Sequence, residues 1–248
     1  MHKKELHNFI RSFNLFEIIW MLGVLISLTL LIILMPDLMF EDKENTLVVI
    51  CSVISIISSP ICEILISKQS RYWTLFSLIF VEITDIIILF ALQLFSSAAI
   101  SLFFWIPFDI ATFFKWSGKN KDEERNELTK VKTYEWWQDL IIVVIMVLSG
   151  IILGFILPDT GSNPHVVAFS NVFEIANGIF LLKRHNEQWI AWFGYLICEI
   201  IIWVSMGHYI MLITVFAMMI NTVYGFAKWL LYIKRKKQNA ATVSHAAL

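Results

Sequence analysis

The sequence predicts an all-α membrane protein with eight transmembrane helices. Its 248 residues are 58% hydrophobic with a mean hydropathy of +0.72, which is rare in a soluble domain and typical of a polytopic membrane protein. Eight apolar runs are each long enough to cross a hydrocarbon core of about 30 Å. Cationic residues are distributed unevenly among the loops between these runs, which predicts an orientation in the membrane.

The predicted helices begin and end at charged or turn-forming segments. The first helix leads into the acidic loop PDLMFEDKEN, and a long charged loop occupies 117–135. Pro107 is expected to kink the fourth helix, because proline removes a backbone donor. The predicted spans are Leu15–Met35, Thr46–Ser67, Tyr72–Gln93, Ser96–Trp116, Trp136–Leu157, His165–Leu182, Gln188–Ser205 and His208–Ile233.

The cations predict which side of the membrane each loop occupies. If the N-terminus is cytoplasmic, all 19 Lys and Arg except Lys43 lie at or near the cytoplasmic face. Cytoplasmic loops carry this excess in membrane proteins, so both termini are predicted to be cytoplasmic, in a bacterial inner membrane. The N-terminus shows no cleavable signal peptide. The opposite face carries acidic residues: Asp37, Glu41, Asp42, Glu44 and Asp159.

Two three-helix segments resemble each other and predict an internal repeat. The third helix of each ends in a matching pair, Lys115/Trp116 and Lys228/Trp229. One helix separates the segments, so both run in the same direction, as in parallel-repeat transporters. The predicted 1+3+1+3 plan divides the chain into an N-terminal segment with an additional helix (1–45), a first repeat (46–116), a charged loop with a linker helix (117–163), a second repeat (164–233) and a cytoplasmic tail (234–248).

The stretch KRHNEQWIAWFGYLICEIIIW, residues 183–203, suggests a binding site. Trp189, Trp192 and Glu199 fall on one helical stripe, and Glu199 lies about halfway across the membrane. Aromatic faces that end at a buried carboxylate suit a flat, positively charged small molecule. Two other interpretations stay open: the tryptophans mark the membrane interface, and Glu199 makes a structural hydrogen bond. The binding interpretation predicts that Trp189→Ala or Trp192→Ala abolishes high-affinity binding and leaves the protein folded.

Carboxylates occur at mid-depth in the predicted spans, whereas Lys and Arg do not. A phosphorylated substrate is disfavoured, because phosphate recognition uses Arg, Lys or helix N-termini. The histidines lie at span ends and form no metal pattern, and no phosphate-binding GxxxxGK[ST] motif occurs. The three cysteines are interpreted as packing residues. The intramembrane acids are Glu63, Glu82, Asp85, Asp109, Glu174 and Glu199.

KRHNEQWIAW and a last helix containing Asn221 resemble the C-terminal half of the PnuC family of vitamin-precursor transporters, and KQSRYW through FDIATFFKW resembles its N-terminal repeat. The resemblance implies a plan similar to SWEET transporters, trimeric assembly, and facilitated diffusion with trapping by a cytoplasmic kinase. Trp189, Trp192 and Asn221 match positions of the family's site, and Asp109 stands where an asparagine is usual. Two departures from the pattern, at Leu196 and at Ser101 or Leu102, leave the substrate open among nicotinamide riboside, thiamine, riboflavin and nucleosides.

These observations predict a transporter for a small cationic vitamin precursor, first nicotinamide riboside and second thiamine. Proton coupling is a further alternative, because buried acids can relay protons. We expect no enzymatic activity, cofactor, metal or nucleic-acid partner. The residues predicted to bind substrate are Glu82, Asp85, Asp109, Glu174, Asn177, Trp189, Trp192, Tyr195, Glu199 and Asn221.

Overall fold

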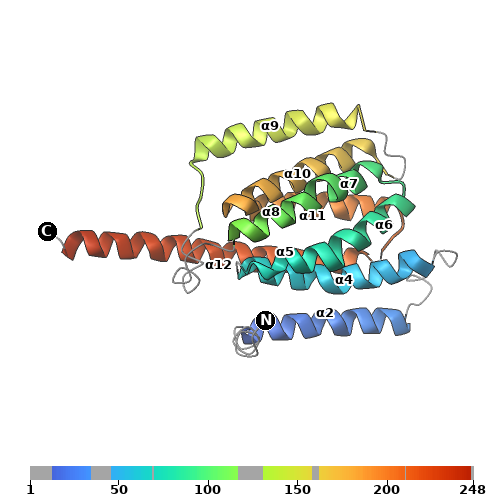
Figure 1. Cartoon of the computed structure of the whole chain (residues 1–248), viewed down its shortest axis with the longest axis horizontal. Helices are drawn as coiled ribbons and strands as arrows, with labels where there is room; N and C mark the ends of the chain where they lie inside the picture. The colour runs from blue at the N-terminus through green and yellow to red at the C-terminus, as the bar shows by residue number, and fades with distance from the viewer. Residues whose placement is uncertain are drawn as a thin grey trace.

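The computed structural model describes residues 13–34, 46–68, 70–116, 131–157, 162–209 and 211–246. This part of the chain is helical apart from turns and one isolated backbone bridge (Figure 1). Two short π-helical segments, η1 and η2, interrupt α-helices. The elements are α2 (Leu15–Leu34), α4 (Thr46–Ser67), α5 (Tyr72–Ser77), η1 (Leu78–Glu82), α6 (Ile83–Ala91), α7 (Phe95–Ile100), η2 (Ser101–Trp105), α8 (Ile106–Trp116), α9 (Trp136–Gly154), α10 (Pro164–Lys183), α11 (Gln188–Ser205) and α12 (Met211–Ala246).

Seven segments of the described chain are long and apolar enough to cross a membrane. The segment α5–η1–α6 forms one of them, and α7–η2–α8 forms another. The apolar part of α2 is a shorter stretch, Leu15–Leu30, and is not one of these seven segments. The all-helical membrane fold predicted from the sequence is therefore confirmed, and the eighth span stays a prediction.

The membrane-spanning segments of the two predicted repeats form a closed ring. Within the first repeat, α4 packs on α5 and α6, and α5 packs on α8. Within the second, α11 lies between α10 and α12. Two contacts join the repeats, because α12 packs along α4 and α10 packs against α7 and α8. Apolar side chains fill most of the space inside, and polar groups remain near its middle.

Breaks in helical regularity occur in the first repeat at the level of the ring's centre. Pro60 lies inside α4, and η1 and η2 interrupt the next two spans. Pro107 has no backbone N–H, and just before it the N–H of Ile106 bonds the carbonyl of Ser101, five residues back. A π-helical turn thus lies directly before Pro107, and the predicted kink itself stays a prediction. In the second repeat, α10, α11 and α12 are uninterrupted α-helices over their described residues.

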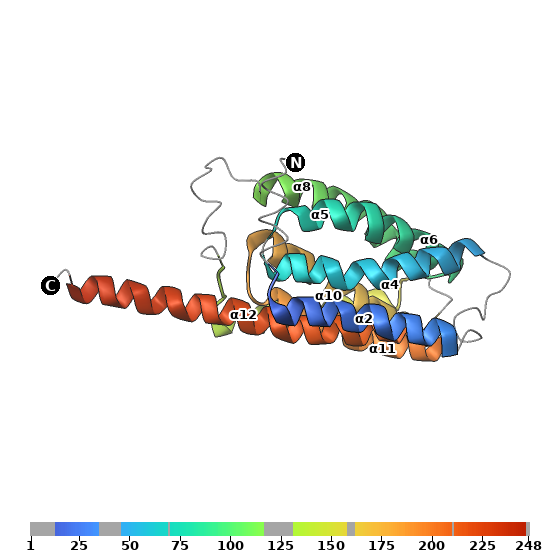
Figure 2. The same ribbon diagram turned by 90° about the horizontal axis from the view of Figure 1, so that it is seen from below.

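Two helices lie outside the ring at opposite edges (Figure 1). At one edge α9 packs on α10 and leaves most of its apolar side chains exposed. Glycine allows the close approach there, since a Cβ on Gly154 would lie 2.1 Å from Nδ1 of His165. At the other edge α2 lies along α4 and α12 (Figure 2).

A buried carboxylate attaches α2 to the ring. Glu17 is 1% exposed and forms ion pairs with Lys68 at the end of α4 (2.8 Å) and with Lys228 of α12 (3.3 Å). The Tyr224 hydroxyl also donates to Glu17 (3.1 Å), and the backbone N–H of Asn14 donates to its second oxygen (3.0 Å). Most apolar side chains of α2 are exposed, but Leu28 is buried against Ile56 of α4, so this polar network and a small apolar contact hold the helix together.

Glu17→Ala is expected to lower stability by about 3 kcal/mol, because two ammonium groups lose a buried partner. Thermal unfolding of the purified protein in detergent measures this loss. Glu17→Gln keeps hydrogen-bond acceptors and should be intermediate. An unchanged unfolding temperature in both variants would show that the network does not hold α2 on the ring.

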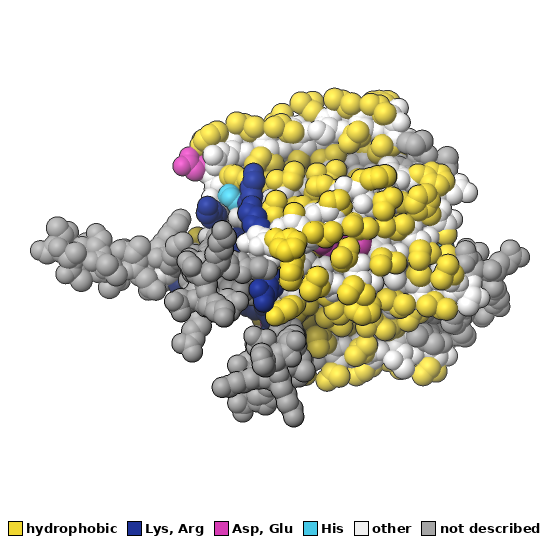
Figure 3. Space-filling model, in the orientation of Figure 1, with side chains coloured by type: hydrophobic (Ala, Val, Ile, Leu, Met, Phe, Trp, Pro, Cys, Tyr) yellow, Lys and Arg dark blue, Asp and Glu magenta, His cyan; other side chains and the backbone are white. Residues whose placement is uncertain are grey.

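Basic side chains collect at one end of the ring. Figure 3 shows Lys and Arg in a band beside an otherwise apolar surface, at the end where α2 begins and from which α12 projects. Near this end Lys132 pairs through its backbone with Arg184 and Asn186, in the turn before α11. Tyr134 stacks on His185 with ring centroids 4.0 Å apart, and burial lowers the pKa of His185. We refer to this side as the basic end.

Helix boundaries differ most from prediction at the C-terminus. The last helix was expected to end at Ile233, with a tail from 234, but α12 continues to Ala246. Lys, Arg, Gln and Ala favour helix, and this stretch contains neither Gly nor Pro, so charge ends the apolar run without ending the helix. The linker helix was expected to reach Leu157, whereas α9 ends at Gly154. At α10 the start is set by Pro164 and by the Asn163 side chain, which accepts a bond from the His165 N–H.

Candidate substrate-binding site

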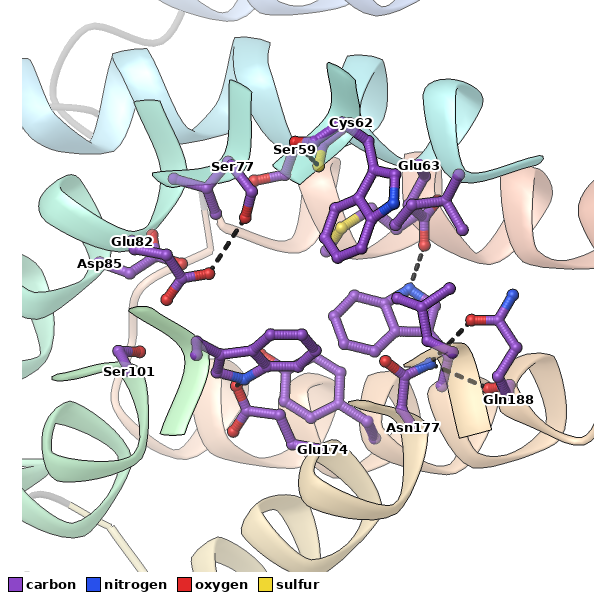
Figure 4. Close-up of a pocket in the computed structure, with 18 of the residues that line it drawn as sticks. Ser59, Cys62, Glu63, Ser77, Glu82, Asp85, Ser101, Glu174, Asn177 and Gln188 are labelled. Carbon is purple, nitrogen blue, oxygen red and sulfur yellow. Dashed lines mark hydrogen bonds between the residues drawn. The ribbon is translucent and has the colours of Figure 1, made fainter. Parts of the chain in front are cut away.

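A cavity lined largely by aromatic side chains lies inside the ring (Figure 4). Its volume is about 90 Å³. Five aromatic rings, from three different spans, contribute to its walls. We call it the aromatic chamber. Those rings are Trp73, Trp105, Trp189, Trp192 and Tyr195.

A second cavity adjoins the first on the side away from the basic end. Its volume is about 60 Å³, and hydroxyl side chains from both repeats line it. We call it the hydroxyl chamber, after Ser55, Ser59, Ser97, Ser101 and Thr214. Both chambers share part of their lining, so they form neighbouring compartments of one site. The shared residues are Ser59, Asp85, Ser101, Glu174, Tyr195 and Met218.

Acidic residues are the charged groups in the lining of both chambers. Four line the aromatic chamber, and Glu199 is added in the hydroxyl chamber. Among the described residues, those that line the two chambers include no Lys, Arg or His. A low-dielectric site of this sign favours a cationic ligand and disfavours phosphate. The four acids of the aromatic chamber are Glu63, Glu82, Asp85 and Glu174.

Two of these acids accept hydrogen bonds from indoles that line the same chamber. Nε1 of Trp105 donates to Glu174 (2.5 Å), and Nε1 of Trp192 donates to Glu63. The Thr222 hydroxyl also reaches Glu63 (3.4 Å). Trp192 in turn stacks on Tyr195, with centroids 4.5 Å apart and planes 18° apart.

The other acids accept bonds from serine. Ser77 donates to Glu82 (3.2 Å, Figure 4), and Ser55 donates to Asp85 (2.8 Å). In the hydroxyl chamber Ser170 donates to Glu199 (3.0 Å). Each of these bonds occupies one oxygen of a carboxylate that has two, so acceptor capacity remains for a ligand.

An amide pair fixes a further acceptor. Nδ2 of Asn177 donates to the backbone carbonyl (3.0 Å) and to Oε1 (3.4 Å) of Gln188. With the amide nitrogen held this way, Oδ1 of Asn177 is turned towards the rings of the chamber (Figure 4). This oxygen is positioned to accept a hydrogen bond from an amide, amine or hydroxyl of a ligand.

Comparison with known proteins identifies the family. Residues 49–231 match the family described as Nicotinamide mononucleotide transporter. The chain belongs to this family. It is therefore a membrane transporter and not an enzyme, as predicted. A relative, the nicotinamide riboside transporter PnuC of Haemophilus influenzae, is 23% identical over 229 residues, which cover 92% of this chain and 95% of the relative.

A solved structure shows the same fold. The crystal structure of the vitamin B3 transporter PnuC superposes with a TM-score of 0.69 at 20% identity, over 91% of this chain and 94% of that one. The resemblance to the PnuC family stated from the sequence is thus confirmed.

In this family member the structure brings together most residues predicted to bind substrate. Glu82, Asp85, Glu174, Asn177, Trp189, Trp192 and Tyr195 line the aromatic chamber, and Glu199 lines the hydroxyl chamber. Trp189 is also a core residue: it is 2% exposed and packs edge-on against Trp229. Direct contact with substrate stays a prediction for each of them.

Two predicted residues lie outside the lining of both chambers. Asn221 faces α4, where its Nδ2 donates to the backbone carbonyl of Pro60 (3.2 Å), so it joins the two repeats. Asp109 is 1% exposed and lies one helical turn beyond Trp105 towards the basic end. The sequence predicts that Asn221 and Asp109 lie within the membrane-spanning helices. Their depth in the membrane does not determine which neighbouring helix each side chain faces.

Other lining residues lie outside the set predicted to bind substrate. Glu63 is one of the intramembrane acids but not one of the predicted site residues, and Trp105 is not among them either. The signal for Glu63 was a carboxylate inside an apolar run. Trp105 carried no such signal, because tryptophan is common in membrane helices. Further lining residues of this kind are Ser59, Cys62, Trp73, Ser77 and Gln188.

Proposed function

We propose that the protein carries a small, flat, positively charged vitamin precursor into the cell, with nicotinamide riboside the first candidate and thiamine the second. The observation that supports this most directly is an aromatic chamber whose charged lining residues are all acidic. Indole and phenol faces attract a pyridinium or a thiazolium, and carboxylates balance its charge. The name of the Haemophilus influenzae relative favours the riboside.

The lining disfavours the phosphorylated molecule in the family's description. Nicotinamide mononucleotide carries a phosphate, which proteins bind through Arg, Lys or a helix N-terminus. Neither chamber presents Lys or Arg in its lining. A riboside, without the phosphate, fits this electrostatic environment.

We further propose an eight-span plan of 1+3+1+3, in which two parallel repeats surround the site. The closed ring supports it, because equivalent helices make equivalent contacts: the third span of each repeat packs on the first span of the other. The basic end supports cytoplasmic termini in a bacterial inner membrane. Assembly as a homotrimer and trapping by a cytoplasmic kinase belong to this proposal through the family resemblance.

Transport is proposed to be facilitated diffusion, with proton coupling as the alternative. Buried carboxylates in the chambers favour the alternative to the extent that they exchange protons during transport. Uptake into liposomes that contain no kinase separates the two. With the membrane potential held at zero, a uniporter only equilibrates the substrate. A proton-coupled carrier accumulates the substrate when a pH gradient is imposed, and a protonophore abolishes that accumulation.

Binding to the purified protein tests the substrate assignment. We expect nicotinamide riboside or thiamine to bind at least tenfold more tightly than riboflavin, a deoxynucleoside or nicotinamide mononucleotide, as expected for a desolvated cation–π contact of about 2 kcal/mol. Isothermal titration calorimetry in detergent provides the measurement. Tightest binding of a neutral or phosphorylated ligand would refute a cation-selective site.

A further inference from the structure

The carboxylates of the aromatic chamber differ in what they bind. Glu82 and Asp85 accept hydroxyl bonds, whereas Glu63 and Glu174 accept bonds from the indoles of Trp192 and Trp105. These two bonds cross between the repeats. Glu63 on α4 of the first repeat holds an indole of the second, and Glu174 on α10 of the second holds an indole of the first.

We propose that Glu63 and Glu174 are specificity-determining residues. They favour a positively charged substrate by polarising the indoles that are hydrogen-bonded to them. The inference rests on the proposed function, since it requires a flat cation in the aromatic chamber. It assigns to these two acids a role that neither Asp85 nor Glu82 shares.

The physical basis is the polarisation of an aromatic ring by an anion at its N–H. The face of an indole is negative and attracts a cation. A carboxylate that accepts the indole N–H shifts electron density towards the ring, and this polarisation is strong where little water screens it. Trp105 and Trp192 therefore present more negative faces than indoles without such a partner.

The geometry keeps this arrangement fixed. Glu63 is 3% exposed, and Thr222 binds the same oxygen that accepts the indole, so the carboxylate cannot turn away without losing two bonds. Its other oxygen, which is buried, has no partner among the described residues. Trp192 is held a second time by its stack on Tyr195. The ring of Trp192 is thus oriented before the ligand arrives.

The predicted consequence is discrimination between ligands of equal shape and different charge. Nicotinamide riboside and its uncharged 1,4-dihydro form are such a pair. We expect Glu63→Gln and Glu174→Gln each to lower the ratio of cation affinity to neutral affinity by about tenfold, the scale of a desolvated cation–π contact. Affinity for the neutral form should change less than twofold, because glutamine keeps an oxygen for the indole N–H.

A double-mutant cycle separates this mechanism from direct charge–charge attraction. In Trp192→Phe the ring remains but the N–H is lost, so adding Glu63→Gln should change the ratio no further. The same holds for Glu174→Gln in Trp105→Phe. If Glu63→Gln or Glu174→Gln keeps its full effect in the phenylalanine background, the carboxylate acts directly on the ligand and the inference is wrong. Trp116→Phe, outside both chambers, is the matched control.

These measurements use the full chain purified in detergent, with size-exclusion chromatography to verify folding. If wild-type protein binds nicotinamide riboside but the glutamine variants retain its preference, only this inference fails. If wild type binds thiamine instead, the same cycle is run with thiamine and its uncharged thiophene analogue. Binding of neither cation would refute the proposed function and the inference together.

Discussion

Trp192→Ala is expected to weaken binding of nicotinamide riboside by about 100-fold, or roughly 2.7 kcal/mol. The substitution removes an aromatic wall of the chamber and the partner on which Tyr195 stacks. It also deprives the buried Glu63 carboxylate of its indole donor, which carries a desolvation cost. Few single changes in the chamber combine these losses. Calorimetric titration of the purified variant measures the effect.

Two further variants are compared with Trp192→Ala, one with an intermediate expected loss of affinity and one as a control. Trp192→Phe retains a ring and should lose about tenfold, because cation–π attraction persists without the N–H. Trp137→Ala removes a tryptophan from the exposed helix α9 and should bind as wild type. Wild-type affinity in Trp192→Ala would assign this residue to the membrane interface, the interpretation that the sequence left open.

Trp189→Ala is expected to act first on stability, with a loss of about 3–5 kcal/mol. The sequence predicted an effect on binding in a folded protein, but the structure revises this for Trp189. Its indole packs edge-on against Trp229, with centroids 5.6 Å apart. A Cβ on Gly225 would lie 2.4 Å from the same ring, so α12 contacts the indole through a residue without a side chain. Truncation leaves a cavity where two helices meet.

Thermal unfolding in detergent tests this prediction. A second variant changes α12, the helix that contacts the indole of Trp189. Gly225→Val would push the indole of Trp189 out of place and should also lower the unfolding temperature. Gly23→Ala, where the added Cβ meets nothing within 4 Å, is the matched control. Normal stability with lost binding in Trp189→Ala would return this residue to the purely binding role predicted from the sequence.

The sequence could predict the helices and the acidic character of the site, because both follow from strong local constraints. A span needs a long apolar run, and an acid within such a run must avoid lipid. Glu82, Asp85, Glu174 and Glu199 line the chambers for this reason. Whether an acid meets a serine, an indole or an amide depends on the neighbouring helix, which one sequence does not specify.

The unknown identity of the neighbouring helix also explains why two residues predicted to bind substrate lie outside the lining. Asn221 and Asp109 lie in the predicted helices, but Asn221 bonds a backbone carbonyl of α4 and Asp109 lies beyond the chamber. Trp105 lines the chamber at the end of η2, where backbone N–H groups bond carbonyls five residues back instead of four. The presence of Pro107 in the sequence does not by itself predict this π-helical turn. Periodicity counted at 3.6 residues per turn does not follow such a segment.

The two repeats of the ring differ in the regularity of their helices. Pro60, η1 and η2 weaken the backbone bonding of the first repeat at the depth of the chambers, while α10, α11 and α12 continue through that depth without a break. Bending stiffness in a helix comes from its unbroken ladder of hydrogen bonds, so compliance is concentrated in one half. We therefore expect the first repeat to bend more readily than the second, and the two crossed indole–carboxylate bonds join the repeats.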